Sequence, residues 1–348
     1  MTGLLSIAKT VGWSSLMRMR RVKQQVWEDL ISPHFVVRCI QTLLNVGYLD
    51  ALAKGPVSPI EFAAQNDLNP RLMQALCEAL YARRILVRDG DRFGLDETGK
   101  LIVGTNLGRG WVDLVFGYES ALHNLEPMVR NHLTYGNDVV RDGKFVGAGS
   151  GLASLDFYFP LVRKLIADGK RRKVLDIGCG DGMFLRYLCA HLPDIEGVGI
   201  DLSPEAVEAG RHSLRSEGLD HRIRLCVADA VNIAQLKSEL AGIDAATTFF
   251  VLHELCDGKK NPRALAFLKA FREAHPGIPF HIVETVRPDP DLMRARPGPA
   301  VEYFLFHDLS GQNPIAREEW RGLFQASGFQ SVQEDYVAFV RTSIFSLT

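Results

Sequence analysis

The chain has 348 residues, of which 47% are hydrophobic and 23% are charged, and its formal net charge is −1. The length suggests two domains, and the composition is that of a globular protein with a buried core. The near-neutral charge argues against nucleic-acid or membrane partners, and no apolar run approaches the roughly 20 residues that cross a bilayer. Six cysteines without a CxxC pair predict a reduced, cytoplasmic protein.

The first part of the chain is mostly helical in pattern. One helix is predicted after Ser58 and a second over residues 70–82, where apolar residues recur on one face. Two short strands are predicted around the turn Asp89-Gly90. Helix, turn, helix and hairpin form a winged-helix pattern, which can bind DNA. Because the second helix has its arginines mainly at its ends, we favour a role in dimerisation.

A glycine-rich stretch, FVGAGSG at residues 145–151, is predicted to be a flexible joint. We therefore expect two domains, residues 1–150 and residues 151–348. Beyond the joint, segments typical of strands alternate with segments typical of helices. This alternation predicts an α/β fold with a mostly parallel sheet and helices on both faces.

The sequence VLDIGCGDG, residues 174–182, joins a predicted strand to a predicted helix. Gly178 and Gly180 allow the backbone to approach a ligand closely. A glycine-rich turn also occurs in dinucleotide-binding proteins, so the turn alone is a weak signal. Asp176 precedes the first glycine, and a carboxylate at that place favours a cationic ligand over a pyrophosphate.

Two further acids end the next two predicted strands. Asp201 lies about twenty residues beyond the glycine turn, where a carboxylate can accept both hydroxyl groups of a ribose. Asp229 ends the following strand, where an adenine amino group can be held. Carboxylates around a glycine turn that lacks Lys and Arg favour S-adenosylmethionine (SAM), which carries a sulfonium and an ammonium and no phosphate.

With these motifs, residues 171–345 resemble the class I SAM-dependent methyltransferases, which have a Rossmann-like domain. The resemblance implies that Asp176 and Gly178 hold the methionine part of SAM. The helical N-terminal part is similar to the dimerisation domain of small-molecule O-methyltransferases, which implies a homodimer and a lid over the substrate. The cofactor-binding residues implied are Asp176, Gly178, Gly180, Asp201, Leu202, Asp229, Ala230 and Phe250.

An apolar run leads into His253 and Glu254 in the segment FFVLHE, residues 249–254, which is predicted as the fourth strand. Because ligands of this fold bind outside the carboxyl ends of the strands, His253 is predicted to lie near the SAM methyl group. O-methyltransferases of this architecture often have His-Asp-Trp here, with the histidine as the base that deprotonates a phenol. This sequence has His253-Glu254-Leu255, which agrees only at the histidine.

A second histidine, His307, follows an aromatic-rich segment and precedes Asp308. One hypothesis is a metal site in which His253 and His307 are ligands, while Asp308 or Glu254 is a ligand or orients a ring. The alternative is a single catalytic histidine and a second histidine with a structural role. The spacing of the two histidines does not decide between them.

The segments HEL, ETVRP and EYFLFHDLSGQ resemble bacterial α-keto acid C-methyltransferases of the phenylpyruvate and 2-ketoarginine type. These enzymes hold a metal through two histidines at such places, so the resemblance implies that His253 and His307 bind an ion such as Fe, Zn or Ni. It also implies methylation of carbon 3 of an α-keto acid through an enolate that the metal stabilises. The product would serve β-methyl amino-acid biosynthesis, and 2-ketoarginine (5-guanidino-2-oxopentanoate) is the substrate we expect.

Several residues of the chain are candidates for binding the substrate. An arginine from the helical part would hold the substrate carboxylate, and an acid facing the pocket would favour a cationic side chain. Two other functions remain open: a metal-free O-methyltransferase with His253 as general base, and a SAM-sensing winged-helix regulator. The substrate-binding candidates are Arg130, Arg141, Glu119 and Asp308.

Overall fold

The computed structural model describes residues 2–236 and 238–348, and contacts within the chain divide it into two compact units. The first unit ends at Asp113 and the second begins at Leu114. Each unit has its own hydrophobic core.

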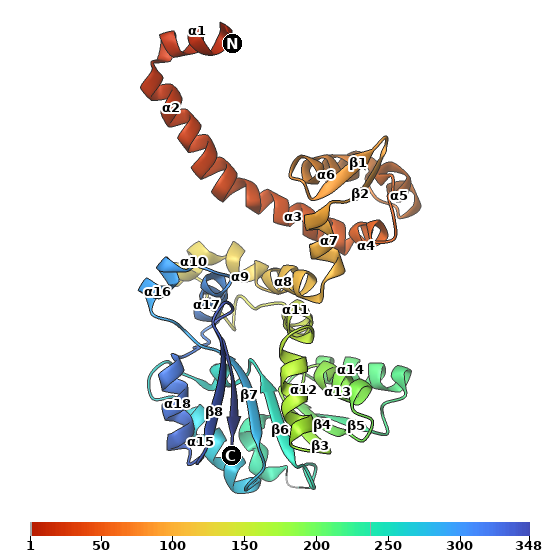
Figure 1. Ribbon diagram of the computed structural model, residues 1–348, viewed down its shortest axis with the longest axis vertical. Helices are drawn as coiled ribbons and strands as arrows, with labels where there is room; N and C mark the ends of the chain where they lie inside the picture. The colour runs from red at the N-terminus through yellow and green to blue at the C-terminus, as the bar shows by residue number, and fades with distance from the viewer. Residues whose placement is uncertain (1, 237) are drawn as a thin grey trace. The chain divides into compact units, whose positions relative to one another are not determined.

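The first unit consists of helices and one small hairpin (Figure 1). Helices α5 and α6 followed by the hairpin of β1 and β2 confirm the predicted winged-helix pattern. The elements are α1 (Thr2–Val11), α2 (Trp13–Val22), the π-helix η1 (Lys23–Ile31), α3 (Ser32–Asn45), α4 (Tyr48–Leu52), α5 (Pro59–Gln65), α6 (Pro70–Ala82), β1 (Leu86–Asp89), β2 (Arg92–Leu95), α7 (Glu97–Gly104) and α8 (Asn106–Gly117), which continues into the second unit.

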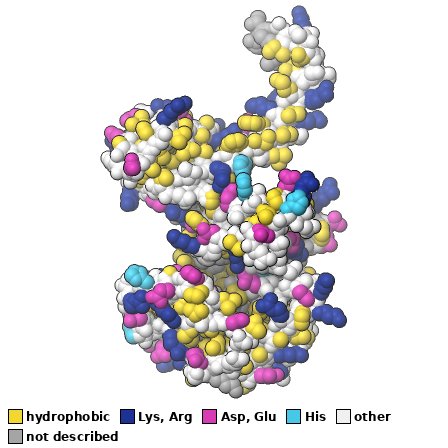
Figure 2. All heavy atoms as spheres, turned by 180° about the vertical axis from the view of Figure 1, so that it is seen from behind, with side chains coloured by type: hydrophobic (Ala, Val, Ile, Leu, Met, Phe, Trp, Pro, Cys, Tyr) yellow, Lys and Arg dark blue, Asp and Glu magenta, His cyan; other side chains and the backbone are white. Residues whose placement is uncertain are grey.

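The helices at the start of the first unit present apolar side chains to solvent (Figure 2). Helix α2 and π-helix η1 bury no residue, and the core of this unit includes residues of α3 from Ile40 onward. Trp13 and Trp27 are 57% and 50% exposed. This segment therefore has an apolar surface that its own unit does not cover.

The second unit is built on a seven-stranded sheet in the order β5-β4-β3-β6-β7-β9-β8. The first five strands in this order are parallel, and β9 pairs antiparallel with both β7 and β8. This is the predicted α/β class, with an antiparallel edge that the sequence did not lead us to expect. The strands are β3 (Lys173–Ile177), β4 (Glu196–Asp201), β5 (Ile223–Val227), β6 (Ala245–Phe249), β7 (Phe280–Thr285), β8 (Val332–Val337) and β9 (Thr342–Leu347).

Helices cover both faces of this sheet (Figure 1). Helices α12, α13 and α14 lie on one face, and α15 and α18 lie on the other. The helical elements are α9 (Glu119–His123), α10 (Leu125–Val129), α11 (Gly143–Leu155), α12 (Tyr158–Asp168), α13 (Met183–His191), α14 (Pro204–Glu217), the 3-10 helices η2 (Ala230–Gln235) and η3 (Leu252–Leu255), α15 (Pro262–Ala274), α16 (Pro290–Ala295), α17 (Ala300–Leu309) and α18 (Arg317–Ala326).

Residues 145–151, which we predicted to be a flexible joint, instead lie within helix α11. The side chain of Asp142 caps this helix by accepting hydrogen bonds from the backbone N–H groups of Lys144 and Phe145. A glycine-rich sequence can therefore continue as a helix here, and the division into compact units falls well before it.

Within the described ranges, no single helix has the length and apolar composition needed to cross a membrane. Among the helices of the described residues, α11 and α12 taken together, as a pair bent by 62°, meet those two criteria.

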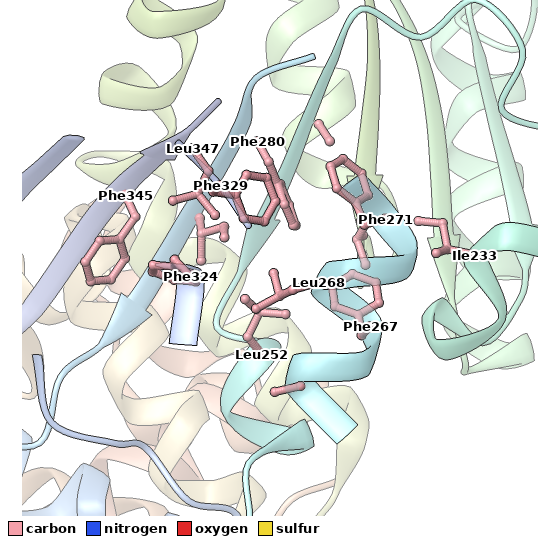
Figure 3. Close-up of a cluster of buried hydrophobic side chains, with 14 of the residues drawn as sticks. Ile233, Leu252, Phe267, Leu268, Phe271, Phe280, Phe324, Phe329, Phe345 and Leu347 are labelled. Atoms are coloured by element: carbon pink, nitrogen blue, oxygen red, sulfur yellow. The ribbon is translucent and has the colours of Figure 1, made fainter. Parts of the chain in front are cut away.

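Aromatic side chains fill the core between the sheet and helices α15 and α18 (Figure 3). Phe271 of α15 is fully buried, and its ring centroid lies 4.4 Å from that of Phe280 on β7. Phe324 of α18 packs in the same cluster against Phe345 of β9. This cluster ties α15 and α18 to the sheet whose strand ends form the site described below.

Replacing Phe271 with alanine should lower the free energy of unfolding by about 3–5 kcal/mol, because the substitution leaves a cavity in a packed core. Urea denaturation followed by circular dichroism would measure the change. Phe339→Ala is the matched control, since this side chain is 68% exposed and its loss should cost much less. Equal losses for the two variants would contradict this description of the core.

Candidate active site

A cavity of about 870 Å³ lies at the carboxyl ends of strands β3, β4 and β6. Gly178 follows β3, Asp201 ends β4 and Phe250 follows β6, and all three residues line the cavity. Every lining residue belongs to the second unit. The predicted location of the site, outside the carboxyl edge of a parallel sheet, is therefore where the chain forms a large cavity.

The glycine turn after β3 forms one wall of this cavity. Gly178 and Gly180 have φ angles of 71° and 54°, which a residue with a side chain rarely adopts. A Cβ atom at Gly178 would also lie only 2.4 Å from Cγ2 of Val251. The backbone N–H of Gly180 donates a 2.8 Å hydrogen bond to Oδ2 of Asp201, which ties the turn to the end of β4.

Asp176 lines the cavity as an almost fully buried carboxyl group, with only 2% of its surface exposed. Burial raises its pKa to about 7, although Thr247 opposes this shift by donating a 2.9 Å hydrogen bond to Oδ1. A cationic ligand beside this carboxyl group would favour its ionised form. The position is therefore suited to the ammonium or sulfonium of SAM, as its place before the glycines led us to expect.

Three predicted cofactor residues lie outside the lining of the cavity. Leu202 is 67% exposed. Asp229 precedes η2 and accepts a 2.9 Å hydrogen bond from the backbone N–H of Val231, and Ala230 is the first residue of η2. β5 ends at Val227, so Asp229 lies two residues beyond the strand that we predicted it to end, and its carboxylate caps η2. Asp181, which we did not predict, does line the cavity and pairs with Arg186 at 2.9 Å.

The strand predicted to run to Glu254 ends earlier, at Phe249. Phe250 has a φ of 58°, which turns the chain out of the sheet, and the short helix η3 then carries His253. The backbone N–H of Phe250 donates a 2.8 Å hydrogen bond to the carbonyl of Val283, which holds this turn against β7. His253 thus lies beyond the carboxyl end of β6, as predicted, on a helix instead of a strand.

His253 and His307 lie side by side in the cavity wall, with their ring centroids 4.5 Å apart and their planes at 77°. Both side chains are more than nine-tenths buried. His307 is on α17, so two elements distant in sequence bring the pair together. The structure therefore places next to each other the two histidines that the sequence could not connect by spacing.

Each ring uses Nδ1 to bond an acceptor in the protein. Nδ1 of His253 lies 2.8 Å from Oε2 of Glu284, and Nδ1 of His307 lies 2.6 Å from the carbonyl oxygen of Tyr303. Because a carbonyl or a carboxylate can only accept, Nδ1 carries the proton in both rings and Nε2 has a free lone pair. Within the described part of the chain, neither Nε2 atom has a hydrogen-bond partner.

Burial lowers the pKa of His307 to about 2, and the neighbouring ring of His253 adds to the effect. His307 is therefore neutral at physiological pH. A buried neutral imidazole whose Nδ1–H is held by a carbonyl is an arrangement found in metal-binding histidines. Among the residues that the structure describes, however, no cluster of three or more His, Cys, Asp or Glu residues could hold an ion.

Glu284 is the functional residue that our reading of the sequence missed. It is fully buried near the end of β7, and its Oε1 also accepts a 2.7 Å hydrogen bond from the backbone N–H of Leu252. The signal was an acid inside the predicted strand FHIVET, because a buried carboxylate requires partners. Glu284 therefore holds both the ring of His253 and the helix η3 that carries it.

The two acids predicted to be ligands or to orient a ring have other partners. Asp308 forms a 2.6 Å ion pair with Arg287, is half exposed and lies outside the cavity lining. Glu254 does line the cavity, but its Oε1 accepts hydrogen bonds from Arg141 at 2.8 Å and from Gln312 at 2.6 Å. The prediction that one of them orients a histidine is wrong, because Glu284 and the carbonyl of Tyr303 take these places.

Of the two candidate arginines, Arg141 lines the cavity and Arg130 does not. Arg141 lines the cavity and also donates a 3.2 Å hydrogen bond to the hydroxyl of Tyr118. Burial opposes its charge, but Tyr118 and Glu254 outweigh burial and raise the pKa of Arg141. Arg130 lies outside the lining, with its side chain 62% exposed and paired with Glu126 at 2.9 Å, and Glu119 also lies outside.

Comparisons with known proteins agree with this geometry. Residues 175–275 match the family described as "Methyltransferase domain". The structure of PigF with SAH aligns with a TM-score of 0.70 at 21% identity, covering 93% of this chain and 99% of that one. The structure of human N-acetylserotonin methyltransferase in complex with SAM aligns with a TM-score of 0.65 at 16% identity, covering 93% of this chain and 96% of that one. The fold is that of the class I methyltransferases, and the matching domain and the methyltransferase relatives support a SAM-dependent methyltransferase.

The chain is also similar along most of its length to a curated enzyme of this kind. It is 29% identical over 300 residues to the 2-ketoarginine methyltransferase of Streptomyces arginensis. The alignment covers 84% of this chain and 85% of that protein.

SAM should bind more weakly below pH 7, because the protonated carboxyl of Asp176 loses its attraction for a cation. Since the pKa of Asp176 is raised to about 7, the dissociation constant should increase up to about tenfold for each pH unit below that value. Titration calorimetry between about pH 5.5 and 8 would measure this slope.

Asp176→Asn should weaken binding and flatten the pH profile, whereas Asp229→Asn, outside the lining, should keep the slope of the native protein. If Asp176→Asn retains the slope, another group is responsible for it.

Proposed function

We propose that the protein transfers the methyl group of SAM to carbon 3 of an α-keto acid, with 2-ketoarginine as the first substrate to test. The observation that carries this proposal is the pair of buried histidines, whose Nδ1 atoms are bonded within the protein and whose Nε2 lone pairs are free. Both histidines line the same cavity as the glycine turn. The similarity to a 2-ketoarginine methyltransferase supports the choice of substrate. Residues Asp176, Gly178 and Gly180 would hold the methionine part of SAM.

The remaining cofactor contacts are also part of this proposal. Asp201 lines the cavity and would accept the ribose hydroxyls, and Phe250 would lie beside the cofactor near the reacting end. Leu202, Asp229 and Ala230 would form the outer, adenine end, beyond the cavity lining. This order follows the strand ends from β3 to β4 to β5, which are neighbours in the sheet.

A metal ion such as Fe, Zn or Ni fits the histidine pair. Both Nδ1 atoms are occupied by acceptors and both Nε2 lone pairs are free, which is how metal-binding histidines are usually held. With only two protein ligands, the other positions would fall to substrate oxygens and water. When bound, the ion would act as a Lewis acid on the keto oxygen and so make carbon 3 more acidic.

The chain itself would bind and orient the substrate. Arg141 would hold the carboxylate of the keto acid through charge-assisted hydrogen bonds. Its bond to Glu254, the residue after His253, keeps the guanidinium next to the histidine pair. Fixing the carboxylate and the keto oxygen together would restrict the orientation of carbon 3, and such orientation lowers the barrier.

A metal-free O-methyltransferase is the second candidate, because Glu284 and His253 also form a suitable general-base pair. The buried carboxylate would stabilise the imidazolium that forms when Nε2 of His253 takes a proton from a hydroxyl group. In this case His307 would have no direct role in the chemistry. The two candidates therefore differ in what they require of His307.

A homodimer is also part of the proposal. The apolar surface of the first helices, including Trp13 and Trp27, is what a dimerisation segment would present to a second copy.

His307→Ala should reduce turnover of 2-ketoarginine at least about 100-fold, and a chelator should have a similar effect on the native protein. A methyl-transfer assay over a panel of keto acids and phenols would measure both. His212→Ala, an exposed position of α14, is the control and should keep full activity. Phenol methylation that survives both treatments would favour the O-methyltransferase instead.

Glu284→Gln should lower activity about 10–100-fold, because the ring of His253 loses its charged acceptor while the shape of the side chain is kept. Circular dichroism and the melting temperature would show whether the variant folds. A folded Glu284→Gln variant with native activity would show that this hydrogen bond does not matter for catalysis.

Arg141→Gln should raise the KM for the keto acid about 10–100-fold, the effect of losing one hydrogen bond to a charged group, and leave SAM binding unchanged. Steady-state kinetics would measure the KM and calorimetry the SAM affinity. Arg130→Gln is the matched control, since that side chain lies outside the cavity. A large effect from Arg130→Gln with none from Arg141→Gln would reverse the assignment.

A further inference from the structure

Helix α11 contains glycines whose presence the fold itself does not explain. A Cβ atom added at Gly143 or Gly147 would meet no heavy atom within 4 Å, and neither residue has a positive φ angle. A glycine inside a helix is less stable than an alanine, because it loses more conformational freedom on folding. Neither crowding nor backbone geometry therefore requires these two glycines.

Both glycines lie in the wall of the cavity. Gly151, one turn further along, also lines it, and the spacing of four residues places all three on one side of the helix. Gly151 has a packing reason to be glycine, because an added Cβ would lie 3.0 Å from Sδ of Met183 on α13. Gly143 and Gly147 have no such packing reason: both are exposed residues that line the cavity.

Helix α11 runs from the substrate end of the cavity to its cofactor end. Arg141, two residues before the helix, bonds Glu254 beside His253. At the other end, Gly151 approaches Met183, which directly follows the glycine turn. With a rise of about 1.5 Å per residue, Gly147 lies about 6 Å along the helix axis from Gly143 and from Gly151. Gly147 therefore lies midway along this wall, between the end near the histidines and the end near the glycine turn.

We infer that Gly143 and Gly147 form the surface on which the carbon-3 substituent of the keto acid lies. Because these positions have no side chain, a long substituent can lie directly against the helix backbone. The absence of side chains would then set the largest substituent that the enzyme accepts. The inference rests on the proposed function, and it makes Gly147 a residue that determines specificity without taking part in the chemistry.

The test measures kcat/KM of Gly147→Ala and Gly147→Val on 2-oxobutanoate, 2-oxohexanoate and 5-guanidino-2-oxopentanoate. The kcat/KM of the variants for the longest substrate, relative to that for 2-oxobutanoate, should fall roughly tenfold or more. Such a fall is expected when a pocket is shortened by one or two carbon atoms. The apparent melting temperature of Gly147→Ala should stay the same or rise by about 2–3 °C, because alanine favours the helix. The alanine variant keeps the test valid if the valine variant does not fold.

Gly322→Ala in α18 is the matched control. A Cβ atom there also meets nothing within 4 Å, but Gly322 lies outside the cavity lining. This variant should gain similar stability and keep the native order of substrates.

If kcat/KM falls by the same factor for all three substrates, or if only the KM for SAM changes, the inference is overturned while the proposed function stays intact. If the native protein methylates none of the three keto acids, the proposed function fails, and this inference fails with it.

Discussion

The hydrogen bond between Glu284 and His253 is the constraint on which the site depends. A carboxylate with no exposed surface is stable only if its oxygens are bonded, and Glu284 bonds both the ring of His253 and the backbone of η3. A residue of β7 thus fixes the ring of His253 and the short helix η3, which follows β6 in the chain. The same bond assigns the proton to Nδ1, so the lone pair of Nε2 is free, whether it binds a metal ion or accepts a proton.

The sheet extends this local constraint to the whole cavity. Strands β3, β4, β6 and β7 are parallel neighbours, so the segments that follow them meet at one edge. The acids Asp176 and Asp201 border the part of the cavity near the glycine turn, and Arg141 borders the part near the histidines. A cationic methyl donor and an anionic acceptor would therefore each meet groups of opposite charge.

Much of this arrangement was predictable because its signals are local in sequence. A strand followed by glycines marks the turn at Gly178, and an apolar run ending in a histidine marks His253 beyond a strand. The pairing of His253 with His307 came from a resemblance, since no spacing rule connects the loop after β6 to helix α17. That these rings lie 4.5 Å apart is a consequence of tertiary packing.

Other features could not be predicted because they depend on partners distant in sequence. Glu284 was visible as an acid in an apolar strand, but its partner was not. Asp308 does not orient a histidine ring, because its carboxylate forms an ion pair with Arg287. The stretch at residues 145–151 looked like a joint because glycine is common in linkers, whereas here a cap at Asp142 starts a helix that forms a wall of the cavity.

The central proposal is that His253 and His307 would together hold one metal ion. Elemental mass spectrometry of the purified native protein, of the single His253→Ala and His307→Ala variants and of the double variant tests it most directly. The account predicts close to one ion per chain in the native protein and loss of the ion in each single variant, with all variants still binding SAM. A native protein that takes up no ion after incubation with Fe, Zn or Ni salts, or single variants that keep it, would contradict the account.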